Sequence, residues 1–179
     1  MKIAIIGFAG SGKSTLATKL SRIYNLPLLH MDKISFYPNW VENTNEESIT
    51  LLSKFLKENP YGWIIDGNYS KVLFDKRMEE ADEIIFLKFN RFTCYLSARK
   101  RAKMYKGKNR ESAPEGCEEN FSYSFRHWIL IEGRRKRRTR KFNQVLIEHK
   151  DKTKVFKNRR QVNKYLEAIE GAVKKLKSF

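Results

Sequence analysis

The sequence predicts an α/β protein with a five-stranded parallel sheet between two layers of helices, and three observations lead to this prediction. Short apolar, β-branched runs alternate along the chain with longer segments of helical periodicity. A glycine-rich stretch at 7–14 joins the first run to the first helix. Two later runs end at an acidic residue, Asp32 and Asp66. With 179 residues the chain is long enough for one such domain, which we expect over 1–179.

The first half of the chain contains three apolar runs separated by helices. Leu16, Leu20 and Ile23 lie on one face of the first helix, which Asn25 can end. Asn45 can begin the second helix, because acidic residues follow it in the first turn. The expected elements are a strand over 1–6, a helix over 13–24, a strand over 26–32, a helix from 45 to the turn at 59–62, and a strand over 63–66.

The second half continues this alternation and becomes strongly basic. Phe125, Trp128 and Ile129 give an apolar face to a long helix, whose middle holds the densest charge run, 134–141. Glycine, proline and mixed charge predict a loop between two of the helices. The expected elements are a helix over 70–81, a strand over 83–89, a helix over 91–105, the loop over 107–120, a helix over 121–149, a strand over 152–157 and a helix over 158–176.

The pattern G-x-x-x-x-G-K-[ST] is fitted at every fixed position by the stretch from Gly7 to Ser14, between a strand and a helix. Its glycines let the backbone turn so that successive N–H groups point inward, and the helix start adds partial positive charge. The lysine of this pattern reaches the β- and γ-phosphates of a nucleotide, and the next hydroxyl can bind Mg²⁺. We therefore expect ATP and Mg²⁺ as cofactors, with nucleotide contacts from Gly7, Ala9, Gly10, Ser11, Gly12, Lys13, Ser14 and Thr15.

Two aspartates at strand ends are the other candidates for chemistry. Ligands of a parallel sheet lie beyond the carboxyl ends of its strands, so Asp32 and Asp66 are expected to face the same crevice as the loop. Asp32 could orient an acceptor hydroxyl, act as its base or bind metal-bound water, whereas Asp66 is expected to hold Mg²⁺ together with Ser14. The alternatives are a capping or surface residue for Asp32 and a plain strand-ending turn for Asp66. His30 is expected in the core or behind the site rather than in catalysis.

Positive charge is concentrated in the second half of the chain. The net charge is +17, and residues 91–179 hold 26 Lys/Arg against 9 Asp/Glu, whereas residues 1–90 are balanced. Such a half-chain favours a polyanionic partner: ATP, a phosphorylated acceptor or nucleic acid. No apolar run approaches the ~20 residues needed to cross a bilayer, and no cleavage-site pattern follows the first run. We therefore expect a cytoplasmic protein with no membrane contact.

Taken together, these motifs resemble a known family. The loop 7–15, the strand ending at Asp32, the segment 63–69 (Trp-Ile-Ile-Asp-Gly-Asn-Tyr) and the strand 84–89 with the basic helix after it are similar to the adenylate-kinase and shikimate-kinase branch of the P-loop kinases. The resemblance implies a three-layer α/β/α P-loop NTPase fold with strand order 2-3-1-4-5.

A narrower resemblance covers nearly the whole chain. The segments 30–34, 66–70 and 107–117 are similar to bacterial proteins of the DNA topology modulation type. One departure from the wider family concerns the acceptor. Nucleoside monophosphate kinases continue the Asp-Gly strand end as Phe-Pro-Arg, but this chain has Asn-Tyr-Ser at 68–70. The arginine that grips an acceptor phosphate is therefore missing at that place.

The resemblance to the kinases also implies a lid-like insertion at about 101–120, whose arginines close over ATP. A second group of arginines lies on the helix after the lid, and the loop after the last strand borders the adenine. The residues that match by position are Arg99, Arg101 and Arg110 in the lid, Arg134 or Arg135 on the following helix, and Arg159 after the last strand.

Functions of different classes remain open on the sequence alone. The first is an ATP-dependent phosphotransferase, a small-molecule kinase that moves the γ-phosphoryl of Mg-ATP to a nucleoside-like, nucleotide-like or other acceptor. Its catalytic residues would be Lys13, Asp32, Arg101, Arg134 and Arg135.

The alternative is a nucleic-acid-binding NTPase associated with DNA topology, which would use the basic half and stack bases on Tyr123, Phe125 and Trp128. A third reading is a nucleotide-binding interaction module without useful turnover. The aromatic stretch 34–43 fits an acceptor pocket and a packed loop equally well.

Overall fold

The computed structural model describes residues 1–177, so the last two residues of the predicted domain 1–179 lie outside the described part. A five-stranded sheet runs through its centre, made of β1 (Lys2–Gly7), β2 (Leu28–His30), β5 (Trp63–Asp66), β6 (Glu83–Leu87) and β7 (Thr153–Phe156). Its order is β2-β5-β1-β6-β7, and every neighbouring pair is parallel. Numbered along the chain without β3 and β4, which form a separate hairpin, this is the predicted order 2-3-1-4-5. The predicted fold class is confirmed.

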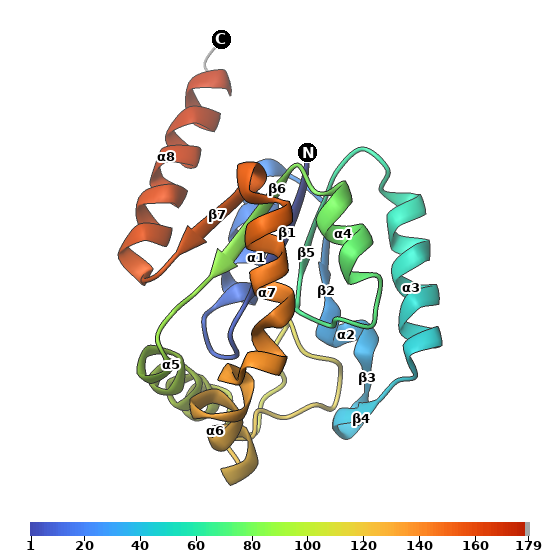
Figure 1. Cartoon of the computed structure of the whole chain (residues 1–179), viewed down its shortest axis with the longest axis vertical. Helices are drawn as coiled ribbons and strands as arrows, with labels where there is room; N and C mark the ends of the chain where they lie inside the picture. The colour runs from blue at the N-terminus through green and yellow to red at the C-terminus, as the bar shows by residue number, and fades with distance from the viewer. Residues whose placement is uncertain (178–179) are drawn as a thin grey trace.

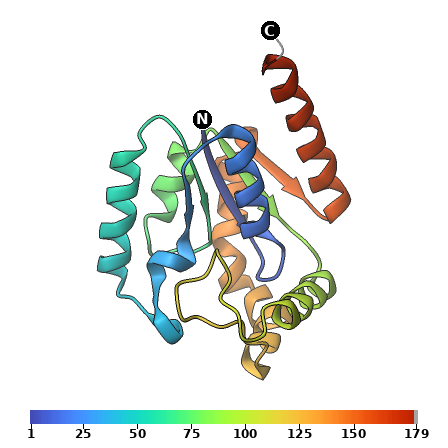
Figure 2. The same ribbon diagram turned by 180° about the vertical axis from the view of Figure 1, so that it is seen from behind.

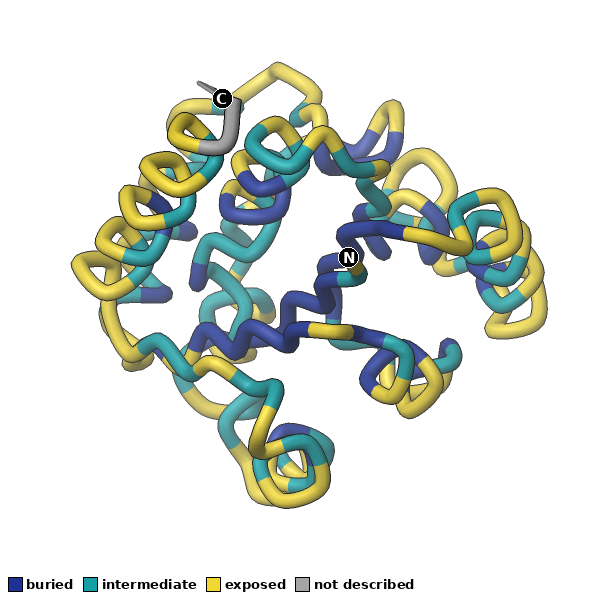
Figure 3. Tube along the Cα trace, turned by 90° about the horizontal axis from the view of Figure 1, so that it is seen from above, coloured by how far each residue is buried: buried dark blue, intermediate teal, exposed yellow. Residues whose placement is uncertain are grey.

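Helices cover both faces of the sheet (Figures 1 and 2). They are α1 (Lys13–Tyr24), α3 (Asn45–Glu58), α4 (Phe74–Glu80), α7 (Lys136–Glu148) and α8 (Arg159–Lys177). One face packs against α3, α4 and α7, in a core that includes Trp63, Phe74 and Phe142. The other face packs against α1 and α8 through Leu16 and Leu20 among others. Figure 3 shows the consequence, a buried central sheet surrounded by helices with exposed outer faces.

The second strand ends earlier than predicted. β2 stops at His30, and Asp32 lies in the first turn of a short helix, α2 (Met31–Ser35), rather than in the strand. A carboxylate is favourable in the first turn of a helix, because it faces the unpaired N–H groups there. The correction moves Asp32 just past the carboxyl edge of the sheet.

Two predicted helices also have different bounds. The helix expected over 70–81 begins only at Phe74, because Leu73 has a left-handed backbone (φ 45°). The single helix expected over 121–149 is divided into α6 (Tyr123–Leu130), the 3₁₀ turn η2 (Glu132–Arg134) and α7. The chain leaves helical geometry at Ile131 (φ −127°, ψ −71°), two residues before a glycine of low helix propensity, Gly133. Apolar periodicity on either side does not reveal such a break.

Three segments lie beyond the carboxyl ends of the strands (Figure 1): α5 (Arg91–Met104), the segment 105–122 and a hairpin of β3 (Phe36–Tyr37) and β4 (Val41–Glu42). The region that they border is called the crevice below. The segment 105–122 contacts this hairpin directly. The backbone N–H of Asn39 donates to the Gly116 carbonyl at 3.3 Å, and the Trp40 indole donates to the Glu118 carbonyl at 2.8 Å. The loop expected at 107–120 is therefore folded over the crevice against residues far away in the sequence.

Within residues 1–177, none of the helices combines the length and the apolar composition that a bilayer crossing requires.

Candidate active site

Two positions of the loop between β1 and α1, Gly7 and Gly10, have a backbone conformation and surroundings that only glycine tolerates. Gly7 and Gly10 have φ of 151° and 78°. A Cβ on Gly7 would lie 2.7 Å from the Leu87 carbonyl oxygen, and a Cβ on Gly10 would lie 2.3 Å from that of Cys94. The loop is thus pressed against β6 and α5, so its path is set by neighbouring backbone.

Lys13 lies at the start of α1 and folds back over the loop. Its Nζ donates to the carbonyl oxygens of Gly7 and Phe8, at 3.1 and 3.3 Å. Burial lowers the pKa of the ammonium group, an effect that the nearby carboxylates of Asp66 and Asp32 oppose. The predicted lysine and both predicted aspartates therefore share one electrostatic environment.

A hydroxyl and a carboxylate meet beside Lys13. Ser14 Oγ donates to Asp66 Oδ2 at 2.8 Å. The other oxygen of Asp66 pairs with Nδ1 of His30, which is buried directly behind it. The pair of Ser14 and Asp66 has the hard oxygen donors that Mg²⁺ prefers alongside phosphate oxygens. No cluster of three or more His, Cys, Asp or Glu side chains suited to a metal occurs within residues 1–177.

Asn68 ties the end of β5 to the loop, a role that the sequence did not reveal. Its Oδ1 accepts from the Gly7 N–H at 3.1 Å, and its Nδ2 donates to the Gly7 carbonyl at 2.8 Å. Both polar groups of one loop residue are thereby held by a single side chain. An amide two residues after a strand-end acid is the signal that could have pointed to it.

Asp32 stands at the other end of the crevice, toward the hairpin. The Tyr69 hydroxyl donates to Asp32 Oδ1 at 2.6 Å, and Arg110 Nη2 lies 3.7 Å from Asp32 Oδ2. Burial and the charge of Asp32 both raise the pKa of Tyr69, so the phenol stays protonated and donates. The Asp32 side chain is 36% exposed and remains accessible to a ligand.

Two arginines of the predicted lid share one acid. Arg101 Nε donates to Glu119 Oε2 at 2.9 Å, and Arg110 Nε lies 3.0 Å from Glu119 Oε1. Burial lowers the pKa of Arg101, and the like charge of Arg110 lowers it further. Glu119 was not predicted as a site residue, because nothing in its sequence neighbourhood pairs it with the two arginines.

The other predicted arginines have different surroundings. Arg134 donates to the Phe89 carbonyl at 2.8 Å and to Cys94 Sγ at 3.3 Å, and it stacks 3.5 Å from the ring centroid of Phe8. Its guanidinium therefore supports the loop from outside. The remaining three are Arg135, which is exposed and pairs with Glu132 at 3.0 Å, Arg99, which is exposed on α5, and Arg159, which bonds Ser97 at 2.7 Å near Gly12.

The remaining loop residues differ in how far they are buried. Ser11 is buried, and its N–H donates to the Phe8 carbonyl at 3.1 Å, closing the turn. Ala9 is half-buried, and Thr15 is exposed in the first turn of α1. Of the predicted residues, the structure brings Lys13, Ser14, Asp66 and Asp32 close to one another.

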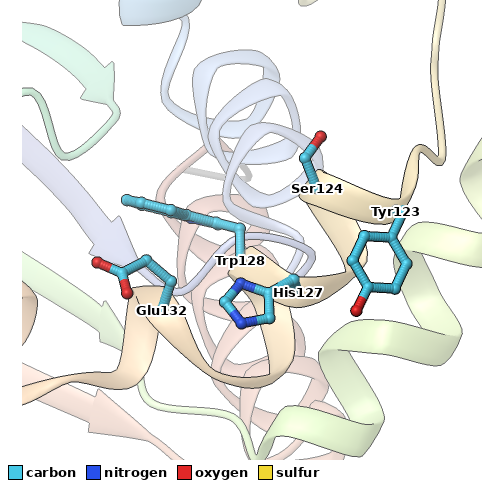
Figure 4. A pocket seen from close by; sticks show the side chains of 5 residues that line it. All are labelled: Tyr123, Ser124, His127, Trp128 and Glu132. Carbon is cyan, nitrogen blue, oxygen red and sulfur yellow. The ribbon is translucent and has the colours of Figure 1, made fainter.

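An open hollow of about 450 Å³ lies elsewhere, on α6 and η2. Figure 4 shows its lining, in which Tyr123, His127 and Trp128 project from α6 and Glu132 follows. Arg138 from α7 lies 5.0 Å from the centroid of the Trp128 ring. This hollow uses none of the loop residues.

Comparisons with known proteins were made for sequence and for structure. No family model and no curated protein matches the sequence. Among solved structures, a gluconokinase from Sinorhizobium meliloti 1021 aligns at 14% identity and TM-score 0.53, over 98% of this chain and 92% of that one.

A deoxyadenosine kinase from M. mycoides with bound dATP aligns at 17% identity and TM-score 0.57, over 97% of this chain and 100% of that one. Another structure of that enzyme, with products dCMP and a flexible dCDP bound, aligns at 15% identity and TM-score 0.53 over 100% of both chains. The chain therefore has the fold of these kinases.

Proposed function

We propose that the protein is an ATP-dependent phosphotransferase that phosphorylates a hydroxyl group of a small molecule. The observation that carries this proposal is the 2.8 Å contact between Ser14 and Asp66, beside Lys13 and a glycine loop of fixed backbone. A loop of inward N–H groups, a lysine and a hydroxyl–carboxylate pair is the set of groups that a Mg²⁺-bound triphosphate requires. The fold shared with two small-molecule kinases agrees with it.

Each residue has a role in this proposal. The loop amides and Lys13 bind the β- and γ-phosphates, and Ser14 and Asp66 would hold Mg²⁺, which supplies charge neutralisation between the phosphates. Asp32 orients the acceptor hydroxyl and takes its proton as the oxygen attacks the γ-phosphorus. The bond to the β-phosphate oxygen breaks, and ADP leaves. Arg101 neutralises charge on the phosphoryl group during transfer.

The segment 105–122 acts in this proposal as the lid of a single domain. It already contacts the hairpin through Asn39 and Trp40, so release of these contacts would admit the acceptor. Arg134 acts as a positioning residue behind the loop, since Phe89 and Cys94 engage its terminal nitrogens.

The direct test uses the wild type and Lys13→Ala with Mg-ATP and a panel of nucleosides, nucleotides, sugars and hydroxy acids. Loss of the Lys13 ammonium should lower kcat/KM by at least about 10²-fold, because a charge that stabilises the transition state is removed. A thermal melt of both proteins checks that the fold is kept. Free ATP hydrolysis with no phosphorylated acceptor would contradict the kinase assignment, and unchanged ATP affinity in Lys13→Ala would contradict the assignment of the loop.

A second candidate function rests on the basic face of α6 and α7. Arg126 lies 5.8 Å from the centroid of the exposed Tyr123 ring, and Arg138 lies 5.0 Å from the centroid of the Trp128 ring. Exposed aromatics among cations suit single-stranded nucleic acid, which combines phosphate charge with stacking bases. The affinity for an oligonucleotide, measured as a function of salt, tests it: binding no tighter than that of an unrelated basic protein would dismiss this candidate.

A further inference from the structure

The charged side chains near Asp32, at the end of the crevice toward the hairpin, are already paired with one another. The Glu119 side chain is only 4% exposed, yet it faces two cations, Arg101 at 2.9 Å and Arg110 at 3.0 Å. Arg110 is itself 10% exposed and also faces Asp32 at 3.7 Å. A carboxylate so deeply buried is stable only while both guanidinium groups stay with it.

Six charged side chains of the site interact with one another. The pKa of Lys13 responds to Asp66, Asp32 and Arg101, and that of Arg101 responds to Arg110, Glu119 and Asp32, so these groups form one electrostatic cluster. Its cations are Lys13, Arg101 and Arg110, and its acids are Asp32, Asp66 and Glu119.

One further cation lies close by but is sealed off. Arg77 is 1% exposed, and its guanidinium donates to the carbonyl oxygens of Gly67 and Tyr69, at 3.1 and 3.3 Å. It therefore supports the wall behind Asp32 and does not face a ligand.

We propose that the phosphoryl acceptor is an uncharged alcohol and that Glu119 sets this preference, an inference that rests on the proposed phosphotransferase. Lys13 and the loop amides take up the charge of the nucleotide. An acceptor phosphate near Asp32 would compete with Glu119 for Arg101 or Arg110, which would leave the buried carboxylate with a single counter-charge. Weakening the pairing of a buried charge is a strong source of specificity.

The aromatic residues near the hairpin indicate which kind of uncharged alcohol the acceptor is. Phe36 packs edge-on against Trp40 and Tyr69, with ring centroids 5.3 and 6.4 Å apart. Tyr69 joins this aromatic cluster to Asp32 through its hydroxyl. A flat, uncharged ring fits such a wall, so nucleosides are the alcohols that the site suits best.

The test compares nucleosides with their own 5′-monophosphates, for example cytidine with CMP. Binding is measured by calorimetry with the loop saturated by a non-hydrolysable ATP analogue and Mg²⁺, and turnover is measured separately with ATP. The wild type should bind the nucleoside at least about tenfold more tightly than the monophosphate, because only the latter needs an arginine that Glu119 occupies.

Three variants separate specificity from a structural role. Glu119→Gln frees an arginine, and it should raise monophosphate affinity about tenfold while nucleoside affinity stays level or falls. Glu119→Asp, which keeps the charge, should retain the wild-type preference. Glu118→Gln removes the same charge from an exposed neighbour on the same segment and should change neither affinity.

Each outcome bears on the proposal. A wild type that binds monophosphates as tightly as nucleosides would overturn it, and so would a Glu119→Gln variant that weakens both ligands alike. Should Glu119→Gln fail to fold, the wild-type comparison alone decides. Absence of turnover with every acceptor would refute the phosphotransferase, whereas the wrong preference with active turnover refutes only the assignment of the acceptor.

Discussion

The two ends of the crevice differ in the groups that form them, which are backbone groups at one end and charged side chains at the other. At the nucleotide end, the backbone itself forms the site: Gly7 and Gly10 press against carbonyl groups, and Asn68 pairs with the peptide groups of Gly7. At the acceptor end, charged side chains from distant segments form the site, with Asp32, Arg110 and Glu119 held by one another. Substitutions at the first end should therefore damage any ligand's binding, whereas those at the second should change which ligand binds.

The largest effect is expected from Gly10→Ala at the backbone-built end. The new Cβ would lie 2.3 Å from the Cys94 carbonyl oxygen at a residue with φ of 78°, so the loop must move. We expect a loss of about 1–3 kcal/mol in the free energy of unfolding and at least a ~100-fold loss of ATP affinity. Denaturant unfolding and nucleotide titration measure the two.

The chain offers a matched control for this change. Gly171 lies in α8 with open space around it, so Gly171→Ala should keep ATP affinity and raise stability slightly, because alanine favours a helix. If Gly10→Ala behaved like Gly171→Ala, the loop would not be set by its neighbours.

An intermediate effect is expected from Asn68→Ala, which removes both hydrogen bonds to Gly7. ATP affinity should fall about tenfold, because Gly7 at the start of the loop would no longer be held by the Asn68 side chain. The relative preference among acceptors should stay unchanged. Titration with the ATP analogue and the panel of acceptors measures both. A shift of acceptor preference instead would place Asn68 at the other end of the crevice.

The smallest effects are expected from substitutions of two adjacent arginines outside the crevice, Arg134 and Arg135, and these two effects should differ. Arg134→Ala loses the bond to the Phe89 carbonyl and the stacking on Phe8, so the free energy of unfolding should fall by about 1–2 kcal/mol. Arg135→Ala should keep the melting temperature and turnover of the wild type, because Arg135 is exposed and pairs only weakly with Glu132. Lost turnover in Arg135→Ala with an intact fold would assign it to catalysis.

The same contrast explains how far the sequence could be interpreted. The strands and the loop were predictable, because local patterns determine them: apolar runs, a glycine spacing, and acids at strand ends. The order of the strands was predicted only through the resemblance to the P-loop kinases. The grouping of Asp32, Arg110 and Glu119 was not, because these residues meet only after the segment 105–122 folds onto the hairpin. The break at Ile131 was missed for a related reason, since apolar periodicity continues on both sides of it.

The hydrogen bonds around Gly7 have a consequence for the rate at which a ligand binds. Its carbonyl accepts from Asn68 and from Lys13 at once, while its N–H is held by Asn68. The loop therefore loses its conformational entropy when the protein folds, and little more is lost when a ligand binds. Arrival of the phosphates needs little more than the turning of one lysine side chain, so capture should be limited by diffusion and charge rather than by a slow rearrangement of the main chain.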